Sequence, residues 1–221
     1  ERAGVIWVYM GPRRPAPALP MVEAAMLPVD EVELFLVQRN CNWLQALEGD
    51  IDTSHFGFLH AGHLTPDVVP EGHPLEFTSD ERAPDYHVSD TPWGTYYGAF
   101  RKVQSKGSTQ TYWRFANYMF PFWTQTPQGV FARHVNARAW VPLDDEHTMT
   151  VHFRWKHGAP PSGLPLKDGK PLGGSKPRPD MIPNGTGWLD RWRLQANEGN
   201  DWLLDREAQR SNRIYSGIDN I

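Results

Sequence analysis

Residues 93–156 contain the pattern that most restricts how this chain can fold. Four stretches there are rich in aromatic and β-branched residues and are separated by turn-type segments: Gly94–Arg101, Thr109–Tyr118, Val130–Val141 and Thr148–Trp155. This composition and spacing are typical of strands joined by short connections. The clearest connection, residues 142–147, predicts a hairpin with Trp140 and Val141 facing Met149 and Val151. We therefore expect an antiparallel sheet in this region.

Helical patterns flank the sheet region on both sides. One runs from Asn42 to about Leu59 and another from about Asn200 to Arg213, while residues 31–39 alternate as a further strand. A segment with seven prolines and seven glycines, between residues 158 and 187, predicts a long loop. The expected fold class is α+β, with helices packed on a curved antiparallel sheet.

The first twenty residues differ in character from the rest. Residues 5–10 form a β-rich run, and four prolines fall between residues 12 and 20. Proline lacks an amide hydrogen and biases the preceding residue away from helix, so the second stretch predicts an extended linker. We expect residues 1–20 to be the terminal strand of a preceding unit plus a linker. Residues 21–221 are then the main domain of a longer chain, truncated at its C-terminal end.

A single cysteine, Cys41, limits the chemistry available to these 221 residues. It excludes an intrachain disulfide, a cysteine-rich zinc site and an iron–sulfur cluster built from this chain alone, so a metal must use histidine and carboxylate ligands. It also favours a reducing compartment, expected to be the cytoplasm. The net charge of −4 argues against a nucleic-acid partner, and no apolar stretch reaches the roughly 18 residues of a membrane span.

The helical pattern that begins at residue 42 carries the most informative polar residues. Four of them fall at positions i, i+3, i+7 and i+10 of one helix face: Gln45, Glu48, Asp52 and His55. Leucines and aromatic residues occupy much of the remaining surface, so we expect this helix to be buried. A buried row of carboxylates and imidazoles is costly unless each group is paired or bound to a metal.

His60 lies five residues after His55, which turns the two imidazoles about 140° apart on an ideal helix. A π-bulge near Gly57 would bring both onto one metal; alternatively, one histidine is a core residue and the other caps the helix end. Two imidazoles and a carboxylate form the facial triad of non-haem Fe(II) sites. The last helical pattern offers Asp201 or Asp205 as the carboxylate, and Asp201 is favoured because apolar residues adjoin it.

These residues resemble the motif of a known family. The resemblance is carried by Asn42, Trp43, Asp52, His55 and His60, together with the acidic helical pattern near residue 200. The sequence is similar to the catalytic domain of Rieske-type ring-hydroxylating oxygenase α-subunits, in particular the phthalate 4,5-dioxygenase branch. Residues 4–12 resemble the last strand of the Rieske domain and residues 141–148 resemble a family hairpin, so the resemblance covers nearly the whole chain.

The resemblance implies a helix-grip, START-like fold around a substrate cavity, with His55, His60 and Asp201 ligating a mononuclear Fe(II). It also implies that Asp52 is the bridging aspartate toward a Rieske [2Fe–2S] cluster on the adjacent subunit. The cysteine and histidine segments that hold such a cluster are absent from these 221 residues, so the cluster is expected in the full-length protein but not on this chain. Trimers or stacked trimers, O2, and an NADH-dependent flavin reductase as electron donor are further implications.

The aromatic residues of the sheet region suit a cavity for a planar ring as a group, whereas for any single one of them an ordinary packed core is the favoured alternative. A carboxylated substrate needs a cation, and the predicted strands offer Arg101, Arg114 and Arg133, unless these face solvent. The favoured function is hydroxylation of an aromatic, carboxylated molecule, by mono- or dioxygenation. Two alternatives are a non-catalytic carrier of an apolar ligand and a zinc hydrolase, although no His-Glu-x-x-His segment is present for the latter.

Overall fold

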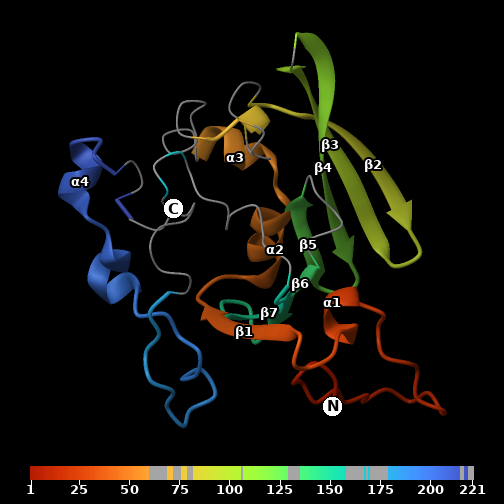
Figure 1. Cartoon of the computed structure of the whole chain (residues 1–221). Helices are drawn as coiled ribbons and strands as arrows, with labels where there is room; N and C mark the ends of the chain where they lie inside the picture. Colours follow the sequence, from red (N-terminus) through yellow and green to blue (C-terminus); the bar gives the residue numbers. More distant parts are fainter. Residues whose placement is uncertain are drawn as a thin grey trace.

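The computed structural model describes residues 1–59, 69–71, 76–78, 82–105, 107–128, 135–157, 167, 169, 179–214 and 217–218. In this part of the chain, seven strands form one antiparallel sheet in the order β1-β7-β6-β5-β4-β3-β2 (Figure 1). The strands are β1 (Val32–Arg39), β2 (Asp85–Thr91), β3 (Gly94–Ser105), β4 (Ser108–Met119), β5 (Trp123–Gln128), β6 (Asn136–Pro142) and β7 (Thr148–Trp155). The helical elements are α1 (Glu23–Met26), α2 (Trp43–Ile51), α3 (Ser54–Leu59), η1 (Glu76–Thr78), η4 (Glu198–Leu203) and α4 (Arg206–Arg210). The expected α+β class is confirmed.

The longest strands, β3 and β4, form a hairpin that projects from the rest of the sheet (Figure 1). They pair along twelve residues each, from Gly94 opposite Met119 to Ser105 opposite Ser108. Gly107, in the connection, has a φ of +76°, a left-handed conformation that glycine adopts at no steric cost. The hairpin therefore holds a long, continuous register between these two strands.

The sequence predicts some strands better than others. The β6–β7 hairpin is confirmed with Val141 opposite Met149, although Trp140 lies opposite Thr150. The sequence does not predict β2 or β5. The edge strand β2 pairs with β3 alone and is mostly exposed, so it needs no continuous apolar run. Residues 130–134 of a predicted strand lie outside the described residues.

One face of the sheet, here called the apolar face, carries the hydrophobic core. Its buried residues are Ala3, Val22, Ala24, Ala25, Val32, Trp123, Ala137, Ala139 and Phe153. The ring of Trp7 stacks on those of Trp123 and Phe153, with centroid separations of 5.9 and 6.4 Å. Residues 5–10, expected to be the terminal strand of a preceding unit, pair with no strand among the described residues and pack Val5 and Trp7 on the sheet.

The opposite face, here called the polar face, carries α2 and α3. Residues directly opposite in the ladders share a face, as do residues two apart along a strand. By this register the face includes Arg101, Arg114, Thr124, Arg138, Thr150 and His152. The α2 residue Asp50 bonds to two of these side chains, which shows that the helix lies on this face.

Strand alternation divides the aromatic residues of β3 and β4 between the two faces. Tyr97 and Tyr112 belong to the polar face. On the other side of the sheet, Trp113 packs against Phe100 and Phe115, with centroids 4.7 and 5.6 Å apart. The composition suggested that these aromatic residues could line one cavity. They do not all do so, because only every second residue of a strand reaches a given face.

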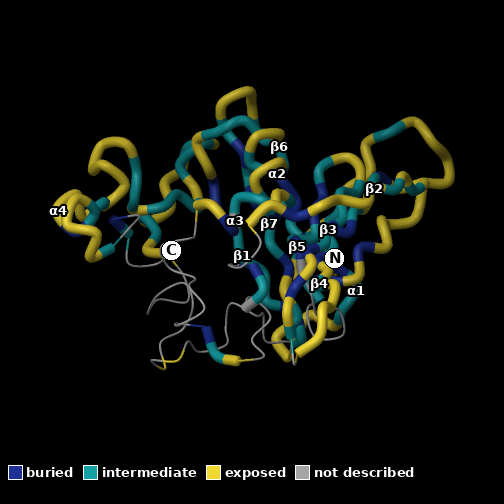
Figure 2. The backbone as a smooth tube through the Cα atoms, turned by 90° about the horizontal axis from the view of Figure 1, so that it is seen from above, coloured by how far each residue is buried: buried dark blue, intermediate teal, exposed yellow. Residues whose placement is uncertain are grey.

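Both predicted helices are interrupted. The first divides into α2 and α3 at Asp52, whose backbone is extended (φ −71°, ψ 114°). The second is replaced by η4 and the short α4, and Asp201 and Trp202 have left-handed φ values of 51° and 52°. Figure 2 shows that α4 is largely exposed and lies apart from the sheet, where much of the buried chain is found. No described helix is long and apolar enough to cross a membrane.

Candidate functional site

Asp52 and His55 lie together at the junction of α2 and α3. The carboxylate of Asp52 accepts hydrogen bonds from the backbone amides of Ser54 (2.7 Å) and His55 (3.2 Å). Its Oδ2 lies 3.6 Å from Nδ1 of His55, and the two side chains are 42% and 32% exposed, respectively. A carboxylate that bonds to nearby amides competes with continuation of the helix, which explains why α2 ends here. Imidazole and carboxylate donors suit a non-haem iron.

The remaining members of the predicted polar row lie elsewhere. Gln45 and Glu48 are exposed on α2, where the buried residue is Leu47. The chain changes direction at Asp52, so the four polar residues do not share one continuous helix face. The expectation of a buried row is therefore wrong, and water solvates the first two residues at no cost to the fold.

The helix α3 is regular from Ser54 to Leu59, and His60 lies outside the described residues. Of the two alternatives, the π-bulge near Gly57 has no counterpart in the described part of α3. A Cβ at Gly57 would lie only 2.7 Å from the carbonyl oxygen of Arg82. Glycine at this position thus permits close packing of α3 on the segment that precedes β2.

The two candidate carboxylates of the C-terminal region are both half exposed, at 50% for Asp201 and 48% for Asp205. Asp201 accepts two hydrogen bonds from Arg206, at 2.6 and 2.7 Å, and this contact lowers the pKa of its carboxyl. Asp205 caps α4 by accepting from the amide of Ala208 and pairs with Arg213 at 3.0 Å. The burial argument that favoured Asp201 over Asp205 is therefore wrong.

Of the three predicted iron ligands, His55 and Asp201 lie within the described residues. The imidazole of His55 fits a non-haem iron in its donor chemistry, and Asp52, the expected bridging residue, lies beside it. Within the described ranges, no three His, Cys, Asp or Glu side chains come together as a potential metal site. His60 lies outside those ranges, and Arg206 holds Asp201 in an ion pair.

Two of the predicted substrate-binding arginines are buried on the polar face, with 1% of Arg101 and 7% of Arg114 exposed. The register of β3 and β4 makes them diagonal neighbours, within reach of each other for long side chains. Arg114 donates to the carbonyl oxygen of Pro127 at 2.6 Å, and burial lowers the pKa of its guanidinium from the ordinary value. Neither arginine faces solvent. Arg133 lies outside the described residues.

Neutral phenols adjoin the buried arginines. Burial raises the pKa of Tyr97 and of Tyr112, so both hydroxyl groups keep their protons at neutral pH. Tyr97 donates to the backbone carbonyl of Ile51, and the ring of Phe77 packs against Tyr112 at a centroid separation of 5.4 Å. The part of the polar face formed by β3 and β4 therefore combines positive charge with hydrogen-bond donors.

A second buried cluster on the polar face is not predicted by the sequence. The carboxylate of Asp50 accepts hydrogen bonds from Thr124 Oγ1, at 2.6 Å, and from Arg138. Trp140 Nε1 also donates to Thr124 Oγ1, at 2.9 Å. The pKa of His152 is lowered to about 3, mainly by burial and to a smaller extent by the positive charges of Arg138 and Arg154. Its imidazole is therefore neutral. No local spacing reveals this cluster, because 88 positions separate Asp50 from Arg138.

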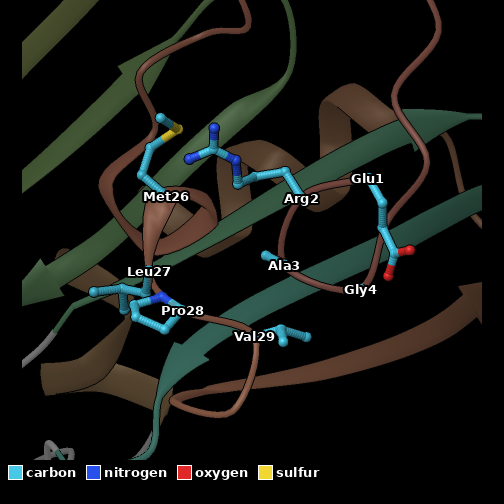
Figure 3. Close-up of a pocket in the computed structure, with 8 residues that line it drawn as sticks. All are labelled: Glu1, Arg2, Ala3, Gly4, Met26, Leu27, Pro28 and Val29. Carbon is cyan, nitrogen blue, oxygen red and sulfur yellow. The ribbon is translucent and has the colours of Figure 1, made fainter.

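The described cavities lie away from the polar face. One of about 960 Å³ lies between the N-terminal segment and the apolar face, and its walls include Trp7, Leu19, Phe122 and Phe153. Another, of about 500 Å³, is formed by residues 1–4 and 26–29 (Figure 3). Figure 3 shows that its lining combines Glu1 and Arg2 with small and apolar residues. Neither cavity is lined by Asp52, His55 or the buried arginines.

The seven-stranded antiparallel sheet agrees with the fold expected from the resemblance to catalytic domains of Rieske-type ring-hydroxylating oxygenases. The chain belongs to the family described as LigXa C-terminal domain like, whose model matches residues 8–169. The resemblance to oxygenase α-subunits is confirmed by this match and by the curated relatives.

Two relatives match over 99% of this chain. The oxygenase subunit of 3-chlorobenzoate-3,4-dioxygenase from Comamonas testosteroni is 48% identical, and the chain covers 50% of it. The oxygenase subunit of phthalate 4,5-dioxygenase from Pseudomonas putida is 29% identical, with 48% of it covered. The chain thus spans about half the length of these relatives. Among solved structures, the terminal oxygenase of carbazole 1,9a-dioxygenase from Nocardioides aromaticivorans IC177 matches with a TM-score of 0.41 and 16% identity, covering 72% of this chain and 48% of that one.

Proposed function

We propose that this chain is the oxygen-activating domain of a ring-hydroxylating oxygenase subunit that acts on an aromatic carboxylate. The observation that carries the proposal is the contact between Asp52 and His55 at the α2–α3 junction. His55, His60 and Asp201 are the proposed ligands of a mononuclear Fe(II), and Asp52 is the proposed bridging residue toward a Rieske [2Fe–2S] cluster. The bound iron would supply the activation of O2.

The chain's own residues would orient this centre. The carboxylate of Asp52 lies beside Nδ1 of His55, so Nε2 would be the nitrogen that binds the metal. Its bonds to two backbone amides fix the carboxylate in turn. For Asp201 to join the ligand set, its carboxylate must leave Arg206, which predicts that metal binding and this ion pair compete.

The buried arginines account for the proposed substrate class. Arg101 and Arg114 place two guanidinium groups on the polar face beside neutral tyrosines, and Arg133 is the third proposed contact. A carboxylate that enters this environment gains charge-assisted hydrogen bonds that an uncharged analogue lacks. The names of the relatives, which include 3-chlorobenzoate and phthalate, support the same chemistry.

The proposed setting is that of a multicomponent enzyme in the cytoplasm. Residues 1–20 would be the end of a cluster-binding domain with its linker, and residues 21–221 the iron domain. Electrons would come from an NADH-dependent flavin reductase through the Rieske cluster of a neighbouring subunit in a trimer or stacked trimers. The names of the relatives as oxygenase subunits support a separate reductase component.

Anaerobic Fe(II) titration of the purified protein tests the proposal. The wild-type protein should bind one equivalent of Fe(II), and His55→Ala and His60→Ala should each abolish binding. His87→Ala, at an exposed histidine of the edge strand β2, is the matched control and should bind normally. Full iron occupancy in both site variants would contradict the ligand assignment.

A non-catalytic carrier of an apolar ligand is the second candidate, because the cavity of about 960 Å³ beside Trp7 is mostly apolar. A carrier should contain no stoichiometric iron and should keep its unfolding temperature in the presence of a chelator. The oxygenase domain should lose thermal stability when the chelator removes the metal, since a ligand that binds the folded state stabilises it.

A further inference from the structure

The side chain of Asp50 is buried in the last turn of α2, with 4% of its surface exposed. One carboxylate oxygen accepts from Thr124 of β5, which is fully buried, and the other accepts from Arg138 of β6. Thr124 is held in turn by the indole of Trp140. The carboxylate is therefore fixed from two strands by directional bonds.

The residues that follow Asp50 are also held by the sheet. The carbonyl of Ile51 accepts from the hydroxyl of Tyr97 in β3. The hydroxyl groups of Ser54 and Tyr86, in β2, lie 2.6 Å apart. Four strands thus contact the end of α2 and the start of α3, and Asp50 is the buried charged residue among the helix residues that make these contacts.

The charges around Asp50 indicate a role in orientation. Arg138 lies opposite His152, which is neutral, and the guanidinium of Arg39 is close enough to interact unfavourably with it. Only Asp50 is buried in its ion pair with Arg138, and the desolvation of its carboxylate offsets much of the attraction, so the pair contributes little net stability. What it does supply is a defined geometry, since both partners require particular bond directions.

We propose that Asp50 is a positioning residue for the candidate metal centre: its bonds to Thr124 and Arg138 fix the end of α2 and thereby the placement of Asp52 and His55. This inference rests on the proposed function for its consequence at the metal. The geometric part concerns only the chain itself and is measurable without iron.

Asp50→Asn removes the charge and keeps the shape of the side chain. Amide hydrogen exchange should become about tenfold faster in residues 51–59 and stay unchanged in β7, and anaerobic Fe(II) affinity should fall about tenfold, as for other residues that orient metal ligands. Arg138→Lys keeps the positive charge but loses the planar geometry of the guanidinium, so it should shift both readouts in the same direction. Glu48→Gln, at an exposed residue of the same helix, is the charge-matched control and should shift neither.

The outcomes separate positioning from general stability. Equal acceleration of exchange in β7 and in residues 51–59 would show a merely structural role and overturn the inference. Wild-type Fe(II) affinity in Asp50→Asn would also overturn it, provided that His55→Ala abolishes binding. If the wild-type protein and His55→Ala bind Fe(II) alike, the proposed function fails, and the exchange data alone decide whether Asp50 fixes the α2–α3 junction. If Asp50→Asn does not fold, the hydrogen exchange and Fe(II) affinity of Arg138→Lys test the inference in its place, by the same criteria.

Discussion

On the apolar face, Trp7, Trp123 and Phe153 pack ring against ring, with centroids 5.9 to 6.4 Å apart. On the polar face, the buried carboxylate of Asp50 and the partly exposed guanidinium of Arg138 are instead joined through directional hydrogen bonds. Apolar packing tolerates exchange among residues of similar volume, whereas a buried polar bond fails when one partner changes. The comparison indicates that one face mainly stabilises the fold and the other mainly orients side chains.

The largest loss of stability is expected on the apolar face. Phe153→Ala removes a fully buried ring that contacts Trp7 and Trp123, and it should lower the free energy of unfolding by about 3–5 kcal/mol. Urea denaturation measures this change. Trp188→Ala, at a ring that is 77% exposed, is the control and should stay within about 0.5 kcal/mol of wild type. A loss below about 1 kcal/mol for Phe153→Ala would contradict the division between the faces.

A smaller loss is expected on the polar face when the pH falls. The pKa of His152 is about 3 in the folded protein and near 6.5 in the unfolded chain, so only the unfolded chain binds this proton between those values. Its contribution to stability is full above pH 6.5 and decreases by about 1.4 kcal/mol per pH unit below it, or about 2 kcal/mol by pH 5.

The comparison of wild type with His152→Gln isolates this contribution from other titrating groups. Urea unfolding at pH 7, 6 and 5 should show a steeper decline for wild type than for the variant. If stability fell equally with pH in the two proteins, the imidazole of His152 would be protonated in the folded state as well. That result would contradict its burial beside Arg138 and Arg154.

A still smaller change in stability is expected from Arg114→Met, because the lost bond to Pro127 is offset by removal of a buried charge. Under the proposed function, binding should change more: affinity for an aromatic carboxylate probe, 3-chlorobenzoate, measured calorimetrically, should fall at least about tenfold. The uncharged analogue 3-chlorobenzyl alcohol serves as the control ligand and should bind both proteins alike. An equal loss of affinity for both ligands would mean that Arg114 shapes the site but does not bind the carboxylate.

No change in the unfolding midpoint is expected from Asp201→Asn, because the Asp201–Arg206 pair is exposed to solvent. The same variant should abolish Fe(II) binding, whereas Asp205→Asn should retain it and still cap α4. Retained iron in Asp201→Asn together with its loss in Asp205→Asn would transfer the ligand assignment to Asp205.

Local patterns in the sequence predict the sheet well. The aromatic and β-branched residues of β3, β4 and β7 and the turn at residues 142–147 are local features of the sequence, and the structure has all of these elements. The helices are predicted less well. The carboxylate of Asp52 bonds to amides two and three residues later, and this local competition ends α2 within a periodic pattern that by itself indicates one long helix.

The site is predictable only where its residues are close in sequence. Asp52 and His55 are three positions apart, and their contact follows from local geometry. The bonds between Asp50 and its partners on β5 and β6 depend on how α2 lies across the sheet, which no local pattern contains. Burial of Arg101 and Arg114 likewise required the strand register, because alternation alone does not say which face helices cover.

In the β3–β4 hairpin, whether Arg101 and Arg114 share a face depends on whether their positions are odd or even. Odd-numbered residues of β3 and even-numbered residues of β4 reach the polar face, as the pairing of Ala99 with Arg114 and of Arg101 with Tyr112 shows. A single residue inserted in β3 before Arg101, with the turn at Gly107 retained, would move the side chains on one side of the insertion to the opposite face. Relatives of this domain can therefore change length at the hairpin tip, but within these strands only insertions or deletions of two residues keep both guanidinium groups on the polar face.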